Sequence, residues 1–381
     1  MSKKKLTKGL AVALVASHLL TGVACNSKDN ERGNNKGDTT PISGETLGAD
    51  VDTNIMLEDV EFETDRSGNY FNDKTAYDLS SAVCNELQEF CGAITGKTPF
   101  VSRVITPGVL AGIMFRESSW GLHADNEEDV AQGYYESRNK TDYTGVGQLH
   151  LSALMDALDR IKTTCDKISQ QNKESISDNY YLKIYNDYGL KNGVTRENAI
   201  KIFEQIEKGG EENVKLGAAL SAMALNDIGA RYWEIASPHI CDNRMMVIMS
   251  YYCGAQNIED YVNRGIIQIH TDEFYNESNK VTFNLDKVKF LDGYYGEFDV
   301  DSQYGKFISG FTYALSVLNI EDVIENGKKF GKKGDECENI KNDLNSNLST
   351  DNLKKYVEKC GENIVINGSI RDYDLQRWHE Y

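Results

Sequence analysis

The chain has 381 residues, of which 40% are apolar and 26% are charged, so it can bury a sizeable core in two or three domains. Its formal net charge of −18 argues against nucleic acid, and against an anionic membrane surface, as the main partner, because phosphate groups would be repelled. No internal repeat with the period of a solenoid is visible. The composition is that of a globular protein.

Residues 1–25 have the pattern of an export signal. Lysines occupy the start, an apolar run extends from Leu10 to Ala24, and Cys25 follows. The run is too short to cross a bilayer as a stable helix. Its end is similar to the processing site of bacterial lipoproteins, with Gly22 where leucine is usual, which predicts a lipid on Cys25. Cleavage after Ala24 by an ordinary signal peptidase would leave the same cysteine without a lipid.

The asparagine after Cys25 resembles the signal for outer-membrane retention, facing the periplasm, if the cell is Gram-negative. The lipid would be the only membrane contact. Residues 26–72 are rich in Asn, Gly, Asp, Thr and Ser, with few large apolar side chains. Such a segment buries too little surface to offset the loss of chain entropy, so we expect a flexible tether.

Helical periodicity begins at Tyr77 and dominates the rest of the chain. Further helices are predicted at 151–168, 196–207, 212–236, 243–262 and 303–318. Strand patterns are confined to short runs at 265–269 and 280–290. We therefore expect a mainly α fold with at most a small β element, organised as one domain over 73–330 and a C-terminal extension over 331–381.

A short apolar helix is predicted from Thr106 to about Ser118. Thr106 can cap its start, Pro107 fits its first turn, and Gly121 lies just beyond its end. One apolar face is formed by Val109, Leu110, Ile113 and Met114. The last turn carries Glu117, where the apolar surroundings and the negative helix end disfavour an ionised carboxylate. Glu117 is therefore a candidate general acid.

Four short motifs follow one another along the chain. They read Glu117-Ser118, Gly145-Val146-Gly147-Gln148, Asn213-Val214 with Gly217 and Leu220, and Ser250-Tyr251-Tyr252-Cys253-Gly254. Their order resembles the catalytic domain of the soluble lytic transglycosylases, the goose-type-lysozyme-like enzymes of peptidoglycan, whose motifs read ES, GLMQ, N-I-x-x-G-x-x-Y-L and A-Y-N-A-G. The resemblance covers about 104–264 and implies a lysozyme-like helical catalytic domain.

The resemblance also implies an activity. Glu117 would protonate the β-1,4 glycosidic oxygen between N-acetylmuramic acid (MurNAc) and N-acetylglucosamine (GlcNAc), then act as base on the 6-hydroxyl of the same muramoyl sugar and leave a 1,6-anhydro product. Tyr251 would hydrogen-bond and orient Glu117. Peptidoglycan strands would be the partner. The residues expected to bind substrate are Ser118, Gly145, Val146, Gly147, Gln148, Tyr252, Trp120 and Tyr143.

Two other functions stay open. In a hydrolytic muramidase, a second carboxylate such as Asp125, Asp129 or Asp142 would position water. A wall-binding protein could keep the fold without turnover. We expect no cofactor and no metal, because neither His123 nor His239 lies in an HExxH or CxxC pattern.

Two segments exceed what the resemblance requires, 126–142 and 165–210. Surface decoration is one interpretation and a lid or groove wall is the other.

The cysteines offer one predicted disulfide. Cys84 and Cys91 would be about 10 Å apart along one helix, too far to pair. Cys337 and Cys360 bracket two short helical stretches, and an antiparallel helical hairpin would bring them together.

Overall fold

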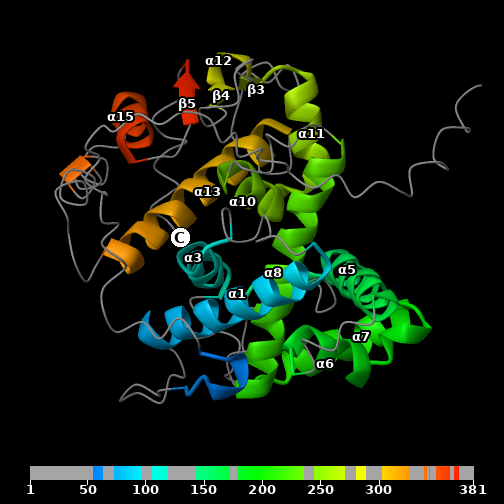
Figure 1. Ribbon diagram of the computed structural model, residues 1–381. Coiled ribbons are helices and arrows are strands. Elements are labelled where there is room, and N and C mark those ends of the chain that lie inside the picture. The colour runs from blue at the N-terminus through cyan, green and yellow to red at the C-terminus, as the bar shows by residue number, and fades with distance from the viewer. Residues whose placement is uncertain are drawn as a thin grey trace, which may run out of the picture. The chain divides into compact units, whose positions relative to one another are not determined.

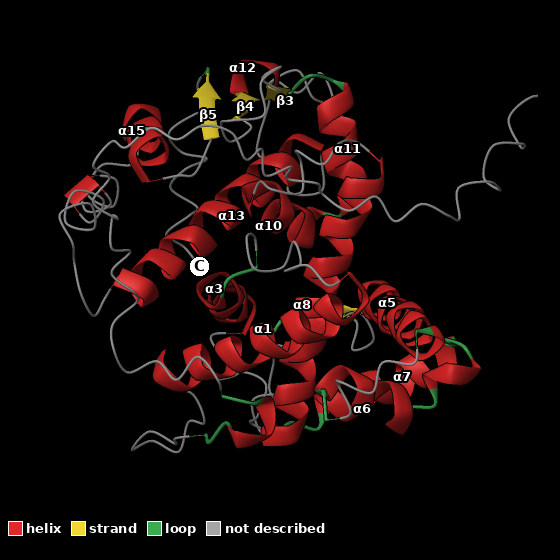
Figure 2. Ribbon diagram, viewed as in Figure 1, coloured by secondary structure: helices red, strands yellow, loops and turns green. Residues whose placement is uncertain are grey.

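The computed structural model of the protein is shown in Figure 1. It describes residues 55–62, 73–95, 105–118, 143–171, 178–235, 244–270, 280–288, 303–326, 339–340, 343, 349–360 and 364–368. All of these belong to one structural unit, Glu45–Tyr381. The fold is mainly helical with a few short strands, as predicted (Figure 2). Within the described ranges, no helix is long and apolar enough to cross a membrane. The export signal and Cys25 lie outside these ranges.

The helix that carries Glu117 is α3 (Pro107–Ser118), as predicted. Thr106 caps it, since its hydroxyl accepts a hydrogen bond from the Val109 N–H at 3.2 Å. The helix packs against both α1 (Asp73–Thr95) and α13 (Gln303–Asn326) (Figure 1). The predicted apolar face is at most 1% exposed. Packing on two sides therefore fixes the helix that positions the candidate acid.

The start of α3 is also anchored to α13 by polar contacts. The Thr106 hydroxyl donates a hydrogen bond of 2.5 Å to the Glu321 carboxylate. The same carboxylate accepts a hydrogen bond of 2.7 Å from Arg244, the first residue of α10 (Arg244–Cys253). Because the Glu321 side chain is only 7% exposed, this pairing satisfies a buried charge and joins three helices.

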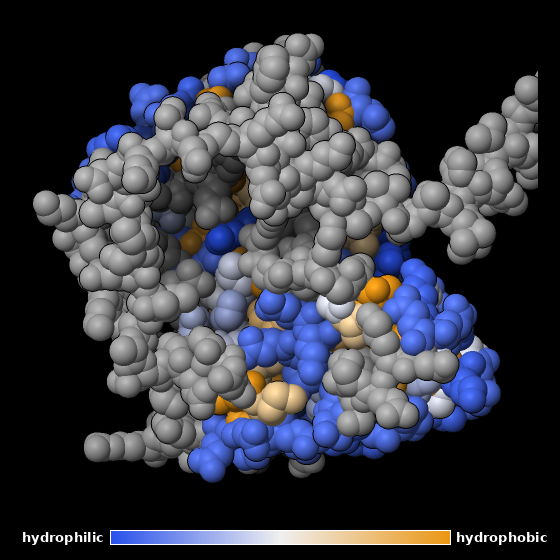
Figure 3. Space-filling view, in the orientation of Figure 1, coloured by the Kyte–Doolittle hydropathy of each residue, from blue (hydrophilic) through white to orange (hydrophobic). Residues whose placement is uncertain are grey.

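A second group of helices packs around α8 (Glu211–Ile235). Helices α1 and α5 (Leu151–Gln170) contact α8 directly, and α6 (Tyr180–Asp187) and α7 (Arg196–Glu207) contact α5. A 3-10 turn, Leu190–Asn192, links α6 to α7. The described surface over α5 and α7 is mostly hydrophilic (Figure 3). Their apolar sides therefore face the core.

The prediction of surface decoration at 165–210 is wrong for the part that the structure describes. Three of its four tyrosines are core residues, since Tyr180, Tyr181 and Tyr185 are at most 7% exposed. The Tyr181 hydroxyl donates a hydrogen bond of 3.0 Å to the Ala219 carbonyl of α8. The polar composition misled because a tyrosine buries a large apolar ring while its hydroxyl finds a partner. The segment 126–142 lies outside the described residues.

The predicted helix at 243–262 is two helices. Helix α10 ends at Cys253 and α11 (Ala255–Asn263) begins after Gly254. Gly254 has φ of 86° and ψ of 142°, a conformation that only glycine adopts without strain. The break separates the motif tyrosines from the helix that follows. The predicted helix at 303–318 continues to Asn326.

A three-stranded sheet joins distant parts of the chain. Strands β3 (Ile267–His270) and β4 (Lys280–Asn284) are antiparallel, and β5 (Ile364–Asn367) pairs with β4 in parallel, with Val281 opposite Ile364. A short helix, α12 (Leu285–Val288), follows β4, and α15 (Thr350–Cys360) contacts β5. Because β5 pairs with β4, residues 364–367 join the C-terminal extension to the domain predicted over 73–330, and the predicted helical hairpin stays a prediction.

The tether predicted over 26–72 is wrong at 55–62. A 3-10 turn, Leu57–Asp59, lies there, and Leu57 and Val60 are at most 4% exposed. The Glu58 carboxylate pairs with Lys183 at 3.2 Å. These few apolar side chains dock on the helical core and offset the loss of chain entropy.

The described cysteines include three free thiols, Cys91, Cys165 and Cys253. Cys84 and Cys91 share helix α1, as predicted. The side chains of Cys337 and Cys360 lie outside the described residues, so their disulfide stays a prediction.

Candidate functional site

The Gly145–Gln148 motif forms the turn of a small hairpin. Strands β1 (Tyr143–Thr144) and β2 (Leu149–His150) are antiparallel, with Tyr143 opposite His150. The Gln148 N–H and its side-chain Nε2 both donate to the Gly145 carbonyl at 3.0 Å. Gln148 has a positive φ of 46°, which is unusual for a residue with a side chain. The turn thus holds an uncommon backbone conformation in place with its own side chain.

Helices α7 and α8 pack against this turn. A Cβ atom added to Gly145 would lie 2.6 Å from Cγ2 of Ile206, and one added to Gly217 would lie 3.3 Å from the same atom. The Thr144 hydroxyl donates to the Phe203 carbonyl at 3.3 Å. Glycine is therefore required at position 145, and Gly217 in the third motif is a packing residue that lets α8 approach the turn closely.

Ser118 connects the end of α3 to the turn. Its hydroxyl lies 2.7 Å from the Val146 carbonyl and 3.1 Å from the Met114 carbonyl. Ser118 is 4% exposed and Val146 is fully buried. The prediction that these two side chains contact the substrate is therefore wrong. Their contact instead holds the last turn of α3, with the half-buried Glu117, against the hairpin turn.

Tyr251 on α10 contacts the same turn. Its hydroxyl donates a hydrogen bond of 2.6 Å to the Gly147 carbonyl. Since a phenol has one proton to donate and Tyr251 gives it to the turn, Tyr251 can form the predicted hydrogen bond with Glu117 only as the acceptor. Burial, followed by the nearby negative charge of Glu117, raises the pKa of Tyr251 far above its ordinary value, while the Ser221 hydroxyl on α8 acts in the opposite direction. Glu117 therefore lies close enough to Tyr251 for its charge to raise the pKa of the phenol.

Tyr313 on α13 is a second phenol beside Glu117. It is 4% exposed, and burial followed by the charge of Glu117 raises its pKa far above the ordinary value. Its hydroxyl makes no hydrogen bond of standard geometry with a described residue, and its contact with the Glu117 carboxyl group is among the causes that raise its pKa. The Arg116 guanidinium lies 5.9 Å from the ring centroid.

Tyr252 covers the ring of Tyr313. The two ring centroids are 4.8 Å apart, with 29° between the ring planes. Tyr252 is 45% exposed, so it forms the outer layer of this stack. Tyr313 and Ser221 were both missed from the sequence. No motif marks either residue, and the family resemblance does not extend to 303–326.

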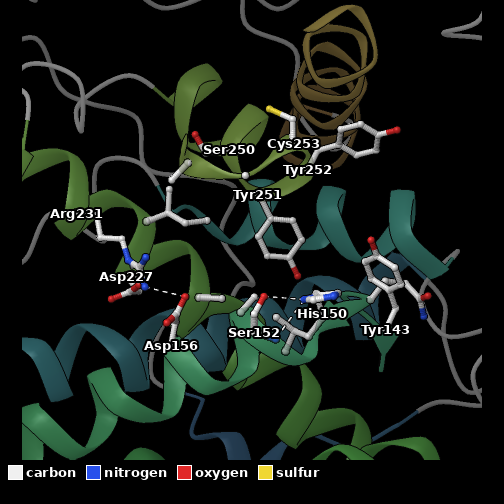
Figure 4. Close-up of a pocket in the computed structure, with 17 residues that line it drawn as sticks. Tyr143, His150, Ser152, Asp156, Asp227, Arg231, Ser250, Tyr251, Tyr252 and Cys253 are labelled. Atoms are coloured by element: carbon white, nitrogen blue, oxygen red, sulfur yellow. Dashed lines mark hydrogen bonds and ion pairs between the residues drawn. The ribbon is translucent and has the colours of Figure 1, made fainter. Parts of the chain in front are cut away.

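A pocket of about 380 Å³ opens beside Tyr251 (Figure 4). Four of the predicted site residues line it, namely Tyr143, Gln148, Tyr251 and Tyr252. Its volume falls within the range typical of small-molecule sites, roughly 300–1,000 Å³. Glu117 is not a lining residue of this pocket and adjoins it through Tyr251. The predicted residues are therefore brought together in two adjacent groups.

The exposed aromatic side of the pocket includes Tyr143 and His150. Tyr143 is 41% exposed and meets the His150 ring edge to face at 5.4 Å. His150 caps α5 by accepting the Ser152 N–H, and its Nδ1 lies 2.7 Å from the Ser152 hydroxyl. Tyr143 can still offer its ring to a sugar. Trp120 and the candidate second carboxylates Asp125, Asp129 and Asp142 lie outside the described residues.

Comparison with protein-family models, with curated proteins and with solved structures gives no match to the chain. Within the described part of the chain, no group of three or more His, Cys, Asp or Glu side chains could hold a metal ion. The case for a function therefore rests on the motif order and on the geometry around Glu117.

Proposed function

We propose that the protein is an exported lytic transglycosylase that cleaves the MurNAc–GlcNAc β-1,4 bond of peptidoglycan. The observation that carries this proposal is the junction at the end of α3. There the turn bearing Glu117 is tied through Ser118 to the hairpin turn, and two phenols, the half-buried Tyr251 and the buried Tyr313, adjoin the carboxyl group. A sugar-sized pocket next to this junction supports the same proposal.

In the proposed reaction, Glu117 acts first as acid and then as base. It gives its proton to the glycosidic oxygen, the bond from that oxygen to C1 of the muramoyl sugar breaks, and positive charge develops on the sugar ring. Glu117 next accepts the proton of the 6-hydroxyl, whose oxygen bonds to C1. The products are a 1,6-anhydromuramoyl end and a free 4-hydroxyl on GlcNAc. Glu117 regains its proton and no water is consumed.

The two phenols keep the surroundings of Glu117 free of a second negative charge. Because their pKa values are raised far above the ordinary range, both stay protonated at neutral pH. Tyr251 holds the Gly147 carbonyl, and so fixes the turn. Gln148 lines the pocket, where its amide is suited to bind the acetamido group of a sugar.

The predicted export signal in residues 1–25 supports a location in the cell envelope, where peptidoglycan lies. A lipid on Cys25 would hold the enzyme at the membrane, and the part of the predicted tether that precedes the 3-10 turn at Leu57–Asp59 would let it reach the glycan strands.

Digestion of purified sacculi tests the proposal. Wild type is expected to release 1,6-anhydromuropeptides, and Glu117→Gln is expected to lose at least about 100-fold in rate because the proton donor is gone. Glu259→Gln on α11, a half-buried glutamate that does not line the pocket, is the matched control and should retain activity. Reducing muramic ends would identify a hydrolytic muramidase instead. If neither wild type nor Glu117→Gln releases muropeptides, a non-catalytic wall-binding protein would be favoured.

A further inference from the structure

One end of the pocket is charged, and the proposed reaction does not use it. Arg231 on α8 bonds to Asp227 on the same helix through Nε at 2.7 Å and to Asp156 on α5 through Nη2 at 2.7 Å. Asp227 also accepts from Arg160 Nε at 2.9 Å. Figure 4 shows Arg231, Asp227 and Asp156 together at one end of the pocket, with Tyr143 at the other.

The members of this cluster differ in exposure. The Asp227 side chain is 8% exposed, so it serves as the buried anchor for both arginines. The Arg231 and Asp156 side chains are 41% and 49% exposed. A guanidinium has five N–H donors, and two of those on Arg231 are used in the contacts with Asp227 and Asp156. The others are available at the pocket surface to an acceptor.

Arg231 is the one lysine or arginine among the described residues that line this pocket. Its guanidinium is held at two points, so its direction is fixed before any ligand arrives. A planar fork with fixed direction is suited to a carboxylate. The exposed oxygen of Asp156 is next to it and suits an N–H donor. The pair therefore matches a ligand that carries both a carboxylate and N–H groups, as a peptide does.

We propose that this charged end binds the stem peptide attached to the muramoyl sugar, with Arg231 holding a peptide carboxylate and Asp156 accepting a peptide N–H. This inference rests on the proposed function, because the peptide arrives as a substituent of the glycan. The sugar occupies the part of the pocket near Gln148 and Tyr251, and the peptide extends toward α5 and α8. The enzyme therefore prefers peptide-bearing glycan to glycan stripped of peptide.

A purely structural role for the cluster makes a different prediction. Arg231 also bridges α5 and α8, and loss of that bridge would lower the turnover of every substrate alike. The ratio of kcat/KM on peptide-bearing glycan to kcat/KM on stripped glycan separates the two roles. Only peptide recognition makes this ratio depend on Arg231.

The experiment measures that ratio for the full-length wild type, for Arg231→Met and for Arg264→Met. Arg264 forms a comparable ion pair with Asp260 at 2.8 Å on α11 and does not line the pocket, so it is the matched control. The substrates are sacculus glycan strands before and after removal of the peptides by an amidase. The wild-type ratio is expected to exceed about ten and to fall at least about fivefold in Arg231→Met, but not in Arg264→Met.

A wild-type ratio near one, or an equal ratio in wild type and Arg231→Met, would overturn the peptide site and leave the proposed function standing. Cleavage of neither substrate by wild type would instead refute the proposed function. If circular dichroism shows that Arg231→Met is unfolded, Arg231→Gln replaces it, because glutamine keeps a donor for Asp227. A wild-type ratio in Arg231→Gln would overturn the inference in the same way.

Discussion

Helices α10 and α13 each place a tyrosine beside Glu117, and the two tyrosine hydroxyl groups differ in their hydrogen bonds. Tyr251 comes from α10, inside the region that carries the motifs, and its hydroxyl is committed to the Gly147 carbonyl. Tyr313 comes from α13, outside that region, and its hydroxyl has no such bond to a described residue. The predicted tyrosine thus supports the turn, whereas the unpredicted one can respond to a change at Glu117.

The difference follows from packing. The hairpin turn lies between Tyr251 and Ser221, so close that a side chain at position 147 would collide with both. By contrast, Tyr313 packs between Arg116 and Tyr252, which contact its ring and leave the hydroxyl to Glu117. We infer that α10 fixes the shape of the site and α13 tunes its chemistry.

The largest expected effect is that of Gly147→Ala. The new Cβ would lie 2.8 Å from the Tyr251 hydroxyl and closer still to the Ser221 hydroxyl. We expect a loss of about 2–3 kcal/mol in the free energy of unfolding, together with loss of activity, because the turn is buried and cannot yield freely. Chemical denaturation measures the change.

Ser221→Gly provides the control for that substitution, since it removes the side chain that the new methyl group meets. The double variant should recover part of the lost stability, with a coupling energy of at least about 0.5 kcal/mol. Strict additivity of the two changes would show that the turn and α8 are not in contact.

Tyr251→Phe has the next largest effect. It leaves the buried Gly147 carbonyl without its hydrogen bond, which costs about 1–3 kcal/mol in the free energy of unfolding. Activity should fall with stability because the turn moves. Tyr143→Phe, an exposed tyrosine of the same pocket, is the comparison and should change stability by less than about 0.5 kcal/mol. An equal small effect of both changes would deny that Tyr251 supports the turn.

Tyr313→Phe separates the two helices. Since its hydroxyl makes no standard hydrogen bond with a described residue, we expect the free energy of unfolding to change by less than about 0.5 kcal/mol. The rate of glycan cleavage should nevertheless fall about tenfold, because a phenol beside the acid is lost. The pH profile of kcat should shift at the same time, which a merely structural role would not cause. Unchanged kcat and an unchanged profile would contradict a chemical role for α13.

The dependence of stability on pH gives the smallest difference. The pKa of Tyr313 is raised in the folded protein, so its contribution is complete below the unfolded pKa of about 10 and is lost as the pH rises above that value. Burial also raises the pKa of the Cys253 thiol to about 12, so this thiol acts in the same direction from a lower pH. Between pH 8 and pH 10.5, Tyr313→Phe should lose about 1 kcal/mol less than wild type. Parallel curves for the two proteins would disprove the burial of an un-ionised phenol.

The sequence predicted those elements whose information is local. Helix α7 has the predicted ends because Thr195 and Asn198 form a capping box and its apolar residues recur at helical spacing. Helix α3 was located by Thr106 and Pro107 in the same way. The break at Gly254 was missed because a single glycine inside an apolar run can be tolerated in a helix or can end it.

Other features depend on distant partners and could not be read locally. The four residues of β5 become a strand because β4 lies beside them, although about 80 residues separate the two in the chain. Tyr313 is a buried aromatic in a helix that is apolar on nearly all sides, so neither periodicity nor a motif singles it out. The candidate acid was predictable from its helix, but its second phenol required the fold.

The most direct test of the central claim follows the oxygen in the product. Wild-type protein digests sacculi in water enriched in oxygen-18, and mass spectrometry then examines the new muramoyl ends. If Glu117 takes the proton of the 6-hydroxyl and that oxygen bonds to C1 of the same muramoyl sugar, the ends are 1,6-anhydro and carry no oxygen-18. Muramoyl ends that carry one oxygen-18 atom would show that water attacks instead, and would contradict the reaction proposed for this site.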